Sequence, residues 1–476
     1  MWFKANLVLC CLLASCQALA EIISLDQFLI QVKSTHPGFV STQKKVTGAE
    51  LKREEAGMMF SPAFFTNLTS SDDHRINLMS IVPYEKAGQK ELEFGVMQQS
   101  RYGLQSKISY DVKKTTLVGV PASSAVYLPF GEEYFDAALS LEIKQSLWKN
   151  SFGSGHRAQE KQAMHSTDAT SYAEKFRARI ILLDAERAYW RLALAQMIET
   201  IQEETFNRTK RLTEWQQRRA DDHLSDTADL LAAKAALKGR ELELAASRNE
   251  TRLALKNFNQ FRGKKDDEIA QAILPDDAQN LLNLNSPARS NDRDDIKAQR
   301  AAVSAKEIGA GLNHARYDAT IDVFAKISRT SVAQDWPDAQ KESVKGNHPL
   351  YVYGLNVSVP LDRDVINKSR RGYVEELEGE KLELESKQRD VENSWIQLNQ
   401  QLADAKETLS LVIDLEKVQK EKFQAERQRI KNGRTTTYQL FSVEQDYLHA
   451  QKSRVQAVAQ VMVLLSVMKT YQDGPL

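Results

Sequence analysis

Cysteine and histidine, the side chains that most often do chemistry, form no reactive or metal-binding pattern in this sequence. All three cysteines fall within the first 16 residues. The eight histidines lack metal-ligand spacing, at positions 36, 74, 156, 165, 223, 314, 348 and 449. The phosphate-binding GxxxxGK, the dinucleotide-binding GxGxxG after a strand, the GxSxG of hydrolases and the HExxH of zinc proteases are all missing. We therefore expect no enzyme, no cofactor and no metal site.

The charged residues could form a Ca²⁺ site or a surface that binds nucleic acid, and neither is favoured. The acidic pairs Asp266/Asp267 and Asp276/Asp277 could bind Ca²⁺, but solvated loop acids are the better interpretation. The 64 Lys+Arg balance 64 Asp+Glu at a pI of about 7.1, so no basic field is available for a phosphate backbone. With 42% hydrophobic residues the chain is too apolar to be disordered, and we expect no nucleic-acid partner.

The first 20 residues have the pattern of a secretory signal. A positive charge at Lys4 precedes an apolar run from Leu7 to Ala14, and Ala18-Leu19-Ala20 matches an A-x-A cleavage site. Cleavage after Ala20 is favoured because helix-like sequence starts at Ser24. The alternative is a lipobox at residues 13–16, which would make Cys16 a lipidated N-terminus.

Two stretches of about a hundred residues are almost free of helix breakers. No proline lies between Pro129 and Pro275 or between Pro360 and Pro475, and Gly239 is the only glycine between residues 156 and 262. Apolar residues recur there at helical or heptad spacing, at Ile181, Ala185, Ala188, Leu192 and Ala195 and at Phe441, Leu448, Val455 and Met462. A helix from His156 to Gln217 would be about 90 Å long. These stretches are predicted to be rods, with the core of a soluble bundle as the simpler alternative for the apolar stripes alone.

Each rod is interrupted near its middle, which predicts two helical hairpins. In the first break, at residues 220–226, Ser225 is the expected N-cap. In the second break, Gly433 stops one helix and a following threonine caps the next.

Between the rods, apolar and polar residues alternate in segments of strand length. The alternation covers residues 104–113, 135–144, 321–328 and 351–359, with a further hairpin candidate at 92–98. This length and period suit a transmembrane β-barrel with a wet interior, although a soluble sandwich has the same alternation. The order of strand pair and helical hairpin occurs twice, and the offsets from Leu147 to Leu361 and from Asp229 to Gln439 are 214 and 210 residues. We therefore expect an internal two-fold repeat.

Local motifs in this order resemble the TolC-like outer-membrane efflux proteins. His36-Pro37 resembles the turn that ends the family's N-terminal helix, and Phe60-Ser61-Pro62 resembles its approach to the first strand. The segments 145–148, with Gly153 and Gly155, and 359–361 resemble its strand-to-helix junctions, and 292–298 resembles the start of its second half. Four strands per chain are expected from the family, so the candidate at 92–98 departs from it.

The resemblance implies a mainly α protein with membrane β-structure. Long helical hairpins would form a trimeric α-helical barrel, and the subunits would share one outer-membrane β-barrel. The implied function is a passive exit duct of a tripartite efflux or type I secretion system, carrying drugs, other small molecules or proteins from the periplasmic tunnel to the outside. The implied partners are two further copies of the chain, a periplasmic adaptor, an inner-membrane transporter and outer-membrane lipid. The alternative from the sequence is a periplasmic coiled-coil adaptor or scaffold, anchored through Cys16 or soluble.

The same resemblance points to residues at the hairpin ends. Asp229 falls on the first tip position, where the family narrows its periplasmic entrance with polar or acidic residues, whereas the helix dipole alone would also favour an acid there. Gln439 and Ser442 fall on the second tip, which makes a second acidic ring doubtful, although Glu444 and Asp446 are close by. Gly433 and Arg434 are candidate adaptor contacts, with an ordinary helix break as the alternative.

The expected organisation follows from these segments. A signal peptide (1–20) and an N-terminal periplasmic helix (21–62) precede the first strands (63–150) and the first hairpin (151–262). An equatorial linker with the opening helix of the second repeat (263–318) leads to the second strand pair (319–361), and the second hairpin with the C-terminus (362–476) ends the chain.

Overall fold

The computed structural model of the 476-residue chain describes residues 21–75, 82–222, 226–265, 268–275, 278–290, 292–345 and 349–472. The expected signal peptide, Cys16 and both acidic pairs lie outside these ranges. The chain divides into two compact units. Unit 1 contains Met1–Thr47, Ser171–Lys297 and Ser386–Leu476, and unit 2 contains Gly48–Thr170 and Ala298–Glu385.

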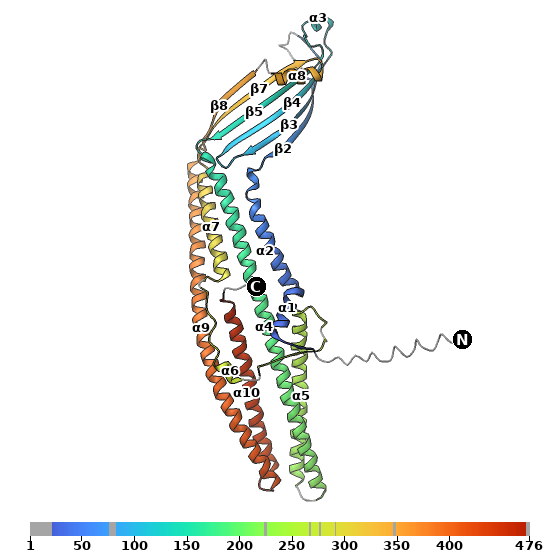
Figure 1. Cartoon of the computed structure of the whole chain (residues 1–476), viewed down its shortest axis with the longest axis vertical. Helices are drawn as coiled ribbons and strands as arrows, with labels where there is room; N and C mark the ends of the chain where they lie inside the picture. Colours follow the sequence, from blue (N-terminus) through green and yellow to red (C-terminus); the bar gives the residue numbers. More distant parts are fainter. Residues whose placement is uncertain are drawn as a thin grey trace, which may run out of the picture. The chain divides into compact units, whose positions relative to one another are not determined.

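Unit 2 is built on one antiparallel sheet of six strands in the order β2-β3-β4-β5-β7-β8 (Figure 1). The strands are β2 (Ala63–Asp73), β3 (Lys86–Gln99), β4 (Leu104–Val118), β5 (Glu133–Ser146), β7 (Thr320–Ala333) and β8 (Pro349–Ser358). The described sheet thus has two strands more than the four that the resemblance implies, and β3 contains the further candidate at 92–98 that left the number open. In β2 the alternation of apolar and polar residues ends at Leu68, and Thr, Ser and Asp follow. The sequence pattern of a strand is therefore short there, and the rest of β2 is extended because it pairs with β3.

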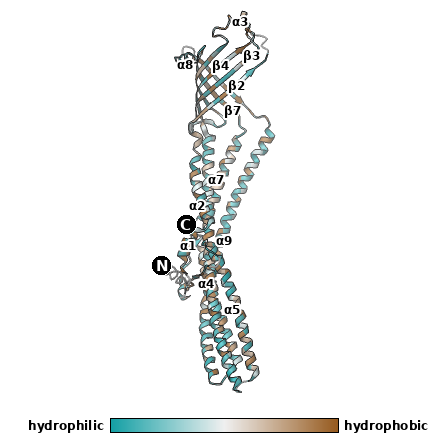
Figure 2. Cartoon of the chain, turned by 90° about the vertical axis from the view of Figure 1, so that its right-hand side faces the viewer, coloured by the Kyte–Doolittle hydropathy of each residue, from teal (hydrophilic) through white to brown (hydrophobic). Residues whose placement is uncertain are grey.

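The two faces of the sheet differ in polarity. Because neighbouring residues on a strand point to opposite faces, the register assigns every side chain to one face. One cross-strand row reads Phe64, Val96, Ile108, Leu141, Ile327 and Tyr351, so a single apolar line crosses all six strands. We call this face, which carries the row, the apolar face. Figure 2 shows apolar and polar residues alternating along these strands.

The opposite, polar face holds charges in pairs. Lys107 lies 2.7 Å from Glu93 on the neighbouring strand. Lys144 lies 2.8 Å from Asp322, whose side chain is 4% exposed. Ser140 and Ser328 are buried and share a hydrogen bond of 2.9 Å. The polar face is thus a network of ion pairs and hydroxyl groups.

The sheet has a helical end and a loop end. At the helical end the chain enters or leaves through α2 (Pro37–Glu55), α4 (Ser154–Asp221), α7 (Asp294–Ala315) and α9 (Arg363–Lys431), with the short helices η1 (Met58–Phe60) and η2 (Ser151–Gly153) at two of the junctions. At the loop end lie α3 (Ala122–Ala125), which follows β4, and α8 (Trp336–Lys345), which follows β7 (Figure 1).

Two glycines let the β3–β4 turn pack against the junction before α4. Gly103 (φ +80°) and Gly153 (φ +76°) both have left-handed backbones, which glycine adopts without strain. A Cβ on Gly153 would lie 2.2 Å from the carbonyl oxygen of Arg101. Arg157 donates to that same oxygen at 2.7 Å, so the turn is fixed to the first turns of α4.

Unit 1 contains two helical hairpins. The first joins the C-terminal part of α4 to α5 (Thr227–Phe261), and the second joins that of α9 to α10 (Thr437–Lys469). Of the residues that the helical and heptad patterns single out, Ala185, Ala188, Leu192, Ala195, Leu448 and Val455 are buried, and Ile181, Phe441 and Met462 are half-buried. None of the helices in the described ranges is both long and apolar enough to cross a membrane.

The N-terminal and linking segments close the core of unit 1. Strand β1 (Glu21–Ile23) pairs in parallel with β6 (Ala270–Ala272), and α6 (Ala278–Leu282) follows. In α1 (Leu25–Thr35), Ser24 caps the first turn, and Phe28 stacks on Phe258 of α5 at 4.2 Å. The hydroxyl of Tyr189 in α4 donates to Ile23 O at 2.9 Å. The linker is thus packed into the core of the unit through β6 and α6.

Candidate functional site

The free end of the first hairpin is capped by an aspartate. The N-cap of α5 is Asp226, whose side chain accepts from Ala228 N at 3.2 Å. The expectation that Ser225 is the cap is therefore wrong by one residue, and Ser225 itself lies outside the described ranges. Asp and Ser have similar preferences for the N-cap position. Residue type therefore does not distinguish Ser225 from Asp226, and the backbone conformation decides which of them is the cap.

Asp229 lies in the first turn of α5 and is half-buried. Its position three residues after the cap puts the carboxylate near the positive end of the helix dipole. Among the described residues, no hydrogen bond or ion pair joins Asp229 to Gly433, Arg434, Gln439 or Ser442. The carboxylate therefore lies in the first turn of α5, and within the described part of one chain it has no link to the second hairpin end.

The free end of the second hairpin is a glycine stop followed by a threonine cap. Gly433 has φ +68°, and Arg434 N donates to Arg429 O at 3.0 Å, which closes the last turn of α9. Thr436 then caps α10 by accepting from Gln439 N at 3.2 Å. No atom of the described residues lies within 4 Å of a Cβ built on Gly433, so glycine is needed there for the backbone angle and not for packing. Arg434, Gln439 and Ser442 are exposed.

A buried glutamate braces this second turn. Glu426 of α9 accepts from the hydroxyl of Thr435 and pairs with Arg429 at 3.3 Å, and its side chain is 9% exposed. The turn that carries Gly433 and Arg434 is therefore held from inside the hairpin.

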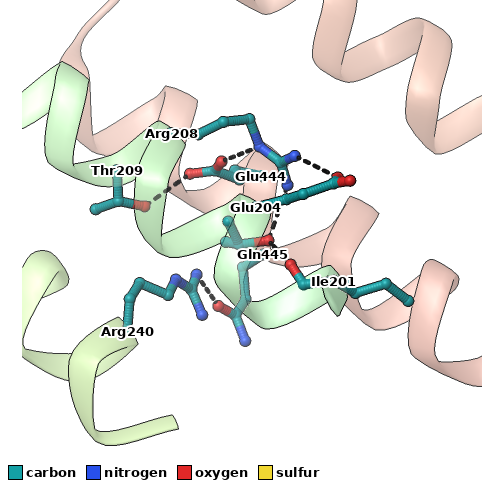
Figure 3. A network of polar contacts seen from close by, with 8 residues as sticks. Ile201, Glu204, Arg208, Thr209, Arg240, Glu444 and Gln445 are labelled. Carbon is teal, nitrogen blue, oxygen red and sulfur yellow. Dashed lines mark hydrogen bonds and ion pairs between the residues drawn. The ribbon is translucent and has the colours of Figure 1, made fainter. Parts of the chain in front are cut away.

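Further along the hairpins, ion pairs join α4 to α10 (Figure 3). Arg208 Nε donates to Glu444 Oε1 at 3.1 Å, and the Glu444 side chain is only 3% exposed. The second Glu444 oxygen accepts from Thr209 at 3.4 Å. Arg208 also donates to Thr205 at 2.8 Å and lies 3.4 Å from Glu204. Almost every polar atom of this buried pair has a partner, as a buried ion pair requires.

A second contact joins α5 to α10 beside the first. Arg240 donates to Gln445 across the hairpins (Figure 3). It also donates to Glu243 on its own helix at 3.0 Å. Within the first hairpin, the Thr213 hydroxyl contacts Ala233 O at 3.2 Å. Both helices of the first hairpin are thus tied to α10.

Between α4 and the second hairpin lies a groove of about 390 Å³. Its apolar part includes Leu212, Trp215, Phe423, Ile430 and Leu440, and its charged part includes Arg208, Arg211, Arg427, Lys431 and Glu444. The side chains of Phe423, Ile430 and Leu440 are buried in one cluster. We call this feature the tip groove. An apolar floor with a mainly cationic rim suits an amphipathic partner that carries acidic groups.

The sequence analysis missed Arg208, Arg240 and the tip groove. A signal was present, because Ile201, Thr205, Arg208, Leu212 and Trp215 follow helical seam spacing and an arginine interrupts the seam. Glu444 and Asp446 were noted as nearby acids, but neither stands alone, since Asp446 pairs with Lys422 at 2.9 Å. Among the described side chains, no group of three or more His, Cys, Asp or Glu could hold a metal ion.

Long helical hairpins attached to one antiparallel sheet define the fold of a class of outer-membrane channels. No family model and no curated protein matches the sequence. Solved structures do match. The outer membrane protein VceC from Vibrio cholerae is 13% identical, with a TM-score of 0.68 over 94% of this chain and 95% of that one.

Two more structures agree. The outer-membrane channel OprN is 14% identical, with a TM-score of 0.68 over 94% of this chain and 89% of that one. The MtrE channel of Neisseria gonorrhoeae is 11% identical, with a TM-score of 0.65 over 94% and 88%. The chain has the fold of these channels, so the resemblance seen in the sequence is confirmed for the fold.

Proposed function

We propose that the chain is an outer-membrane exit channel that works as a homotrimer without catalysis. One observation carries the proposal, namely the apolar row that crosses all six strands opposite a polar, ion-paired face. Tyr351, Phe64 and Ile108 of that row are 64%, 70% and 54% exposed, and lipid would cover them. The ion-paired face would then line a wet pore.

The edges of the sheet support closure by further copies. In the part of the chain that the structure describes, β2 and β8 each have one edge without a partner strand, and free edges cannot face hydrocarbon. Six alternating strands make β2 and β8 run in opposite directions, so β8 of one copy can pair in antiparallel with β2 of the next. Three copies of six strands would give a ring of eighteen, a size at which a barrel keeps an aqueous channel.

The hairpin ends are the proposed periplasmic entrance. Asp229 would narrow the opening, while Gly433, Arg434, Gln439 and Ser442 would contact a periplasmic adaptor. The tip groove, with its apolar floor and cationic rim, is a suitable seat for an amphipathic helix of that adaptor. An inner-membrane transporter would supply the cargo, drugs or secreted proteins, so that the channel belongs to a tripartite efflux or type I secretion system.

The test uses the chain after cleavage at Ala20, in which no cysteine remains because all three lie before residue 17. Single cysteines along β2 would be combined with single cysteines along β8, and the purified protein would be oxidised in detergent. We expect disulfide-linked ladders that stop at three chains, together with discrete conductance steps in planar bilayers. A monomer that stays soluble without detergent and forms no ladder would contradict the proposal.

A further inference from the structure

The cations of the apolar face lie at one end of the sheet. The strands are fully described, and their apolar face carries no charged side chain in the rows nearest the helical end. The first charged side chain along the face is Arg329, in the same cross-strand row as Phe94 and Tyr110. The next row towards the loop end contains Leu68, Leu92 and Val112, and the row after it contains Ser70, Lys90 and Lys114. Lys86 lies two rows further along β3. The uncharged band therefore ends in a border of lysines at the loop end.

Two of these lysines stand directly opposite each other. Lys90 of β3 and Lys114 of β4 are register partners, and like charges in that position repel. Lys114 also pairs with Glu133 and lies 5.5 Å from the Phe135 ring centroid, whereas Lys90 is exposed. Asp72, the other acid at this border, pairs with Lys86 at 2.9 Å. An anion placed between Lys90 and Lys114 would relieve the repulsion.

Helix α8 lies on the same face at the same level. The Ser331 hydroxyl donates to Ala339 O at 2.8 Å, and Tyr110 and Ser343 share a hydrogen bond of 3.2 Å. Ala339 is fully buried in a cluster with Val112 and Ala137. Because Tyr110, Val112, Ala137 and Ser331 all belong to the apolar face, α8 covers that face over β5 and β7 where the uncharged band ends.

The exposed part of α8 has the composition of a membrane-interface helix. Trp336 lies in the first turn, where its ring meets that of Phe135 in the sheet edge to face at 6.4 Å and stays 36% exposed. Val344 is 56% exposed, and Lys341, Lys345, Asp338 and Glu342 are also exposed along the helix. Tryptophan prefers the headgroup layer, and lysines reach from that layer to phosphate. A helix with two cations and two acids is not itself an anion site, so the excess charge comes from the strands, where Lys86, Lys90 and Lys114 stand against the two acids Asp72 and Glu133.

We infer that this border binds the phosphate of an anionic lipid in the outer leaflet, with Lys90 and Lys114 on either side of the phosphate and α8 lying in the headgroup layer. The inference rests on the proposed function, since the apolar face must meet lipid. The ligand is a lipid and not a soluble anion because the two lysines continue directly from the apolar rows, which its acyl chains would cover.

The test compares Lys90→Gln/Lys114→Gln with Lys113→Gln, a neighbouring lysine on the polar face. Detergent-purified full-length protein would be mixed with phosphatidylglycerol or phosphatidylcholine and examined by native mass spectrometry. We expect the double variant to retain at most about a fifth of the phosphatidylglycerol adducts of the wild type, with Lys113→Gln unchanged and phosphatidylcholine adducts equal in all three. Equal phosphatidylglycerol binding by the double variant and the wild type would overturn the inference.

A second measurement places α8. In vesicles of brominated phosphatidylcholine, part of the tryptophan fluorescence should be quenched, and Trp336→Phe should remove a quenched component. If Trp336→Phe leaves the quenched fraction unchanged, α8 does not lie in the headgroup layer. Conductance in neutral phosphatidylcholine bilayers separates the two proposals. If the double variant conducts like the wild type, the channel function is intact and the lipid-binding result tests the lipid inference alone. If the wild type does not conduct, the proposed channel function is contradicted.

Discussion

Arg208 of α4 and Glu444 of α10 form a buried ion pair with 3.1 Å between Nε and Oε1, across 236 residues of sequence. The pair joins the two helical hairpins of one chain a few turns from their free ends. An uncompensated charge in a buried position is costly, so the hairpins are stabilised against separation at this point. In an exit channel, separation of the hairpins would widen the entrance.

The first prediction concerns this pair. Glu444→Gln keeps the shape of the side chain but removes the charge that Arg208 faces. Because Arg208 keeps Glu204 and some solvent, we expect a loss of about 1–3 kcal/mol, seen as a lower Tm in detergent. Conductance in planar bilayers should rise. Asp446→Asn is the control, since its pair with Lys422 is exposed and worth about 0–1 kcal/mol.

The second prediction separates two roles of acids at the first tip. Asp229→Ala should raise the leak conductance if the carboxylate narrows the entrance. Asp226→Ala removes the N-cap and should lower stability by about 1 kcal/mol without changing the leak. If Asp229→Ala conducts like the wild type, Asp229 serves only the helix dipole.

The third prediction is a pH dependence at the start of α2. Burial lowers the pKa of His36, whose Nδ1 accepts from Phe39 N at 3.3 Å and whose ring stacks on Phe261 at 5.4 Å. The unfolded chain thus takes up a proton at higher pH than the folded chain, so stability falls as the pH drops below about 6.5. We expect the decrease in Tm between pH 7.5 and 5.5 to be smaller in His36→Asn. His449→Asn, at an exposed position of α10, should leave the decrease as it is in the wild type.

The fourth prediction contrasts two glycines. Gly153→Ala introduces a Cβ at 2.2 Å from Arg101 O on a left-handed backbone, so we expect a loss of about 2–4 kcal/mol. Gly239 lies inside α5, where no described atom is within 4 Å of an added Cβ, so Gly239→Ala should stabilise the fold by about 0.5–1 kcal/mol. Thermal unfolding of both variants checks the signs. Equal Tm values would show that the junction tolerates the added methyl group.

Local patterns in the sequence predicted the elements and some of the candidate site. The missing breakers predicted the long helices, and alternation predicted β4, β5, β7 and β8. Gly433 and the threonine after it predicted the second hairpin end, because φ near +68° and a side-chain cap depend on a few adjacent residues. These features follow from backbone sterics and hydrogen bonds within one or two turns.

Other features depended on partners far away in the chain. Most of β2 lacks a clear pattern of its own, and its hydrogen bonds to β3 make it a strand. The sequence did not predict that Arg208 pairs with Glu444. It also did not predict that α8 packs on the apolar face. The sequence by itself determined where the chain is helical or extended, since that is a local balance of sterics, capping and periodicity. Only the tertiary structure decided how many strands form the sheet, which charges are buried together and where the apolar face ends, because burial and ion pairing depend on segments up to hundreds of residues apart.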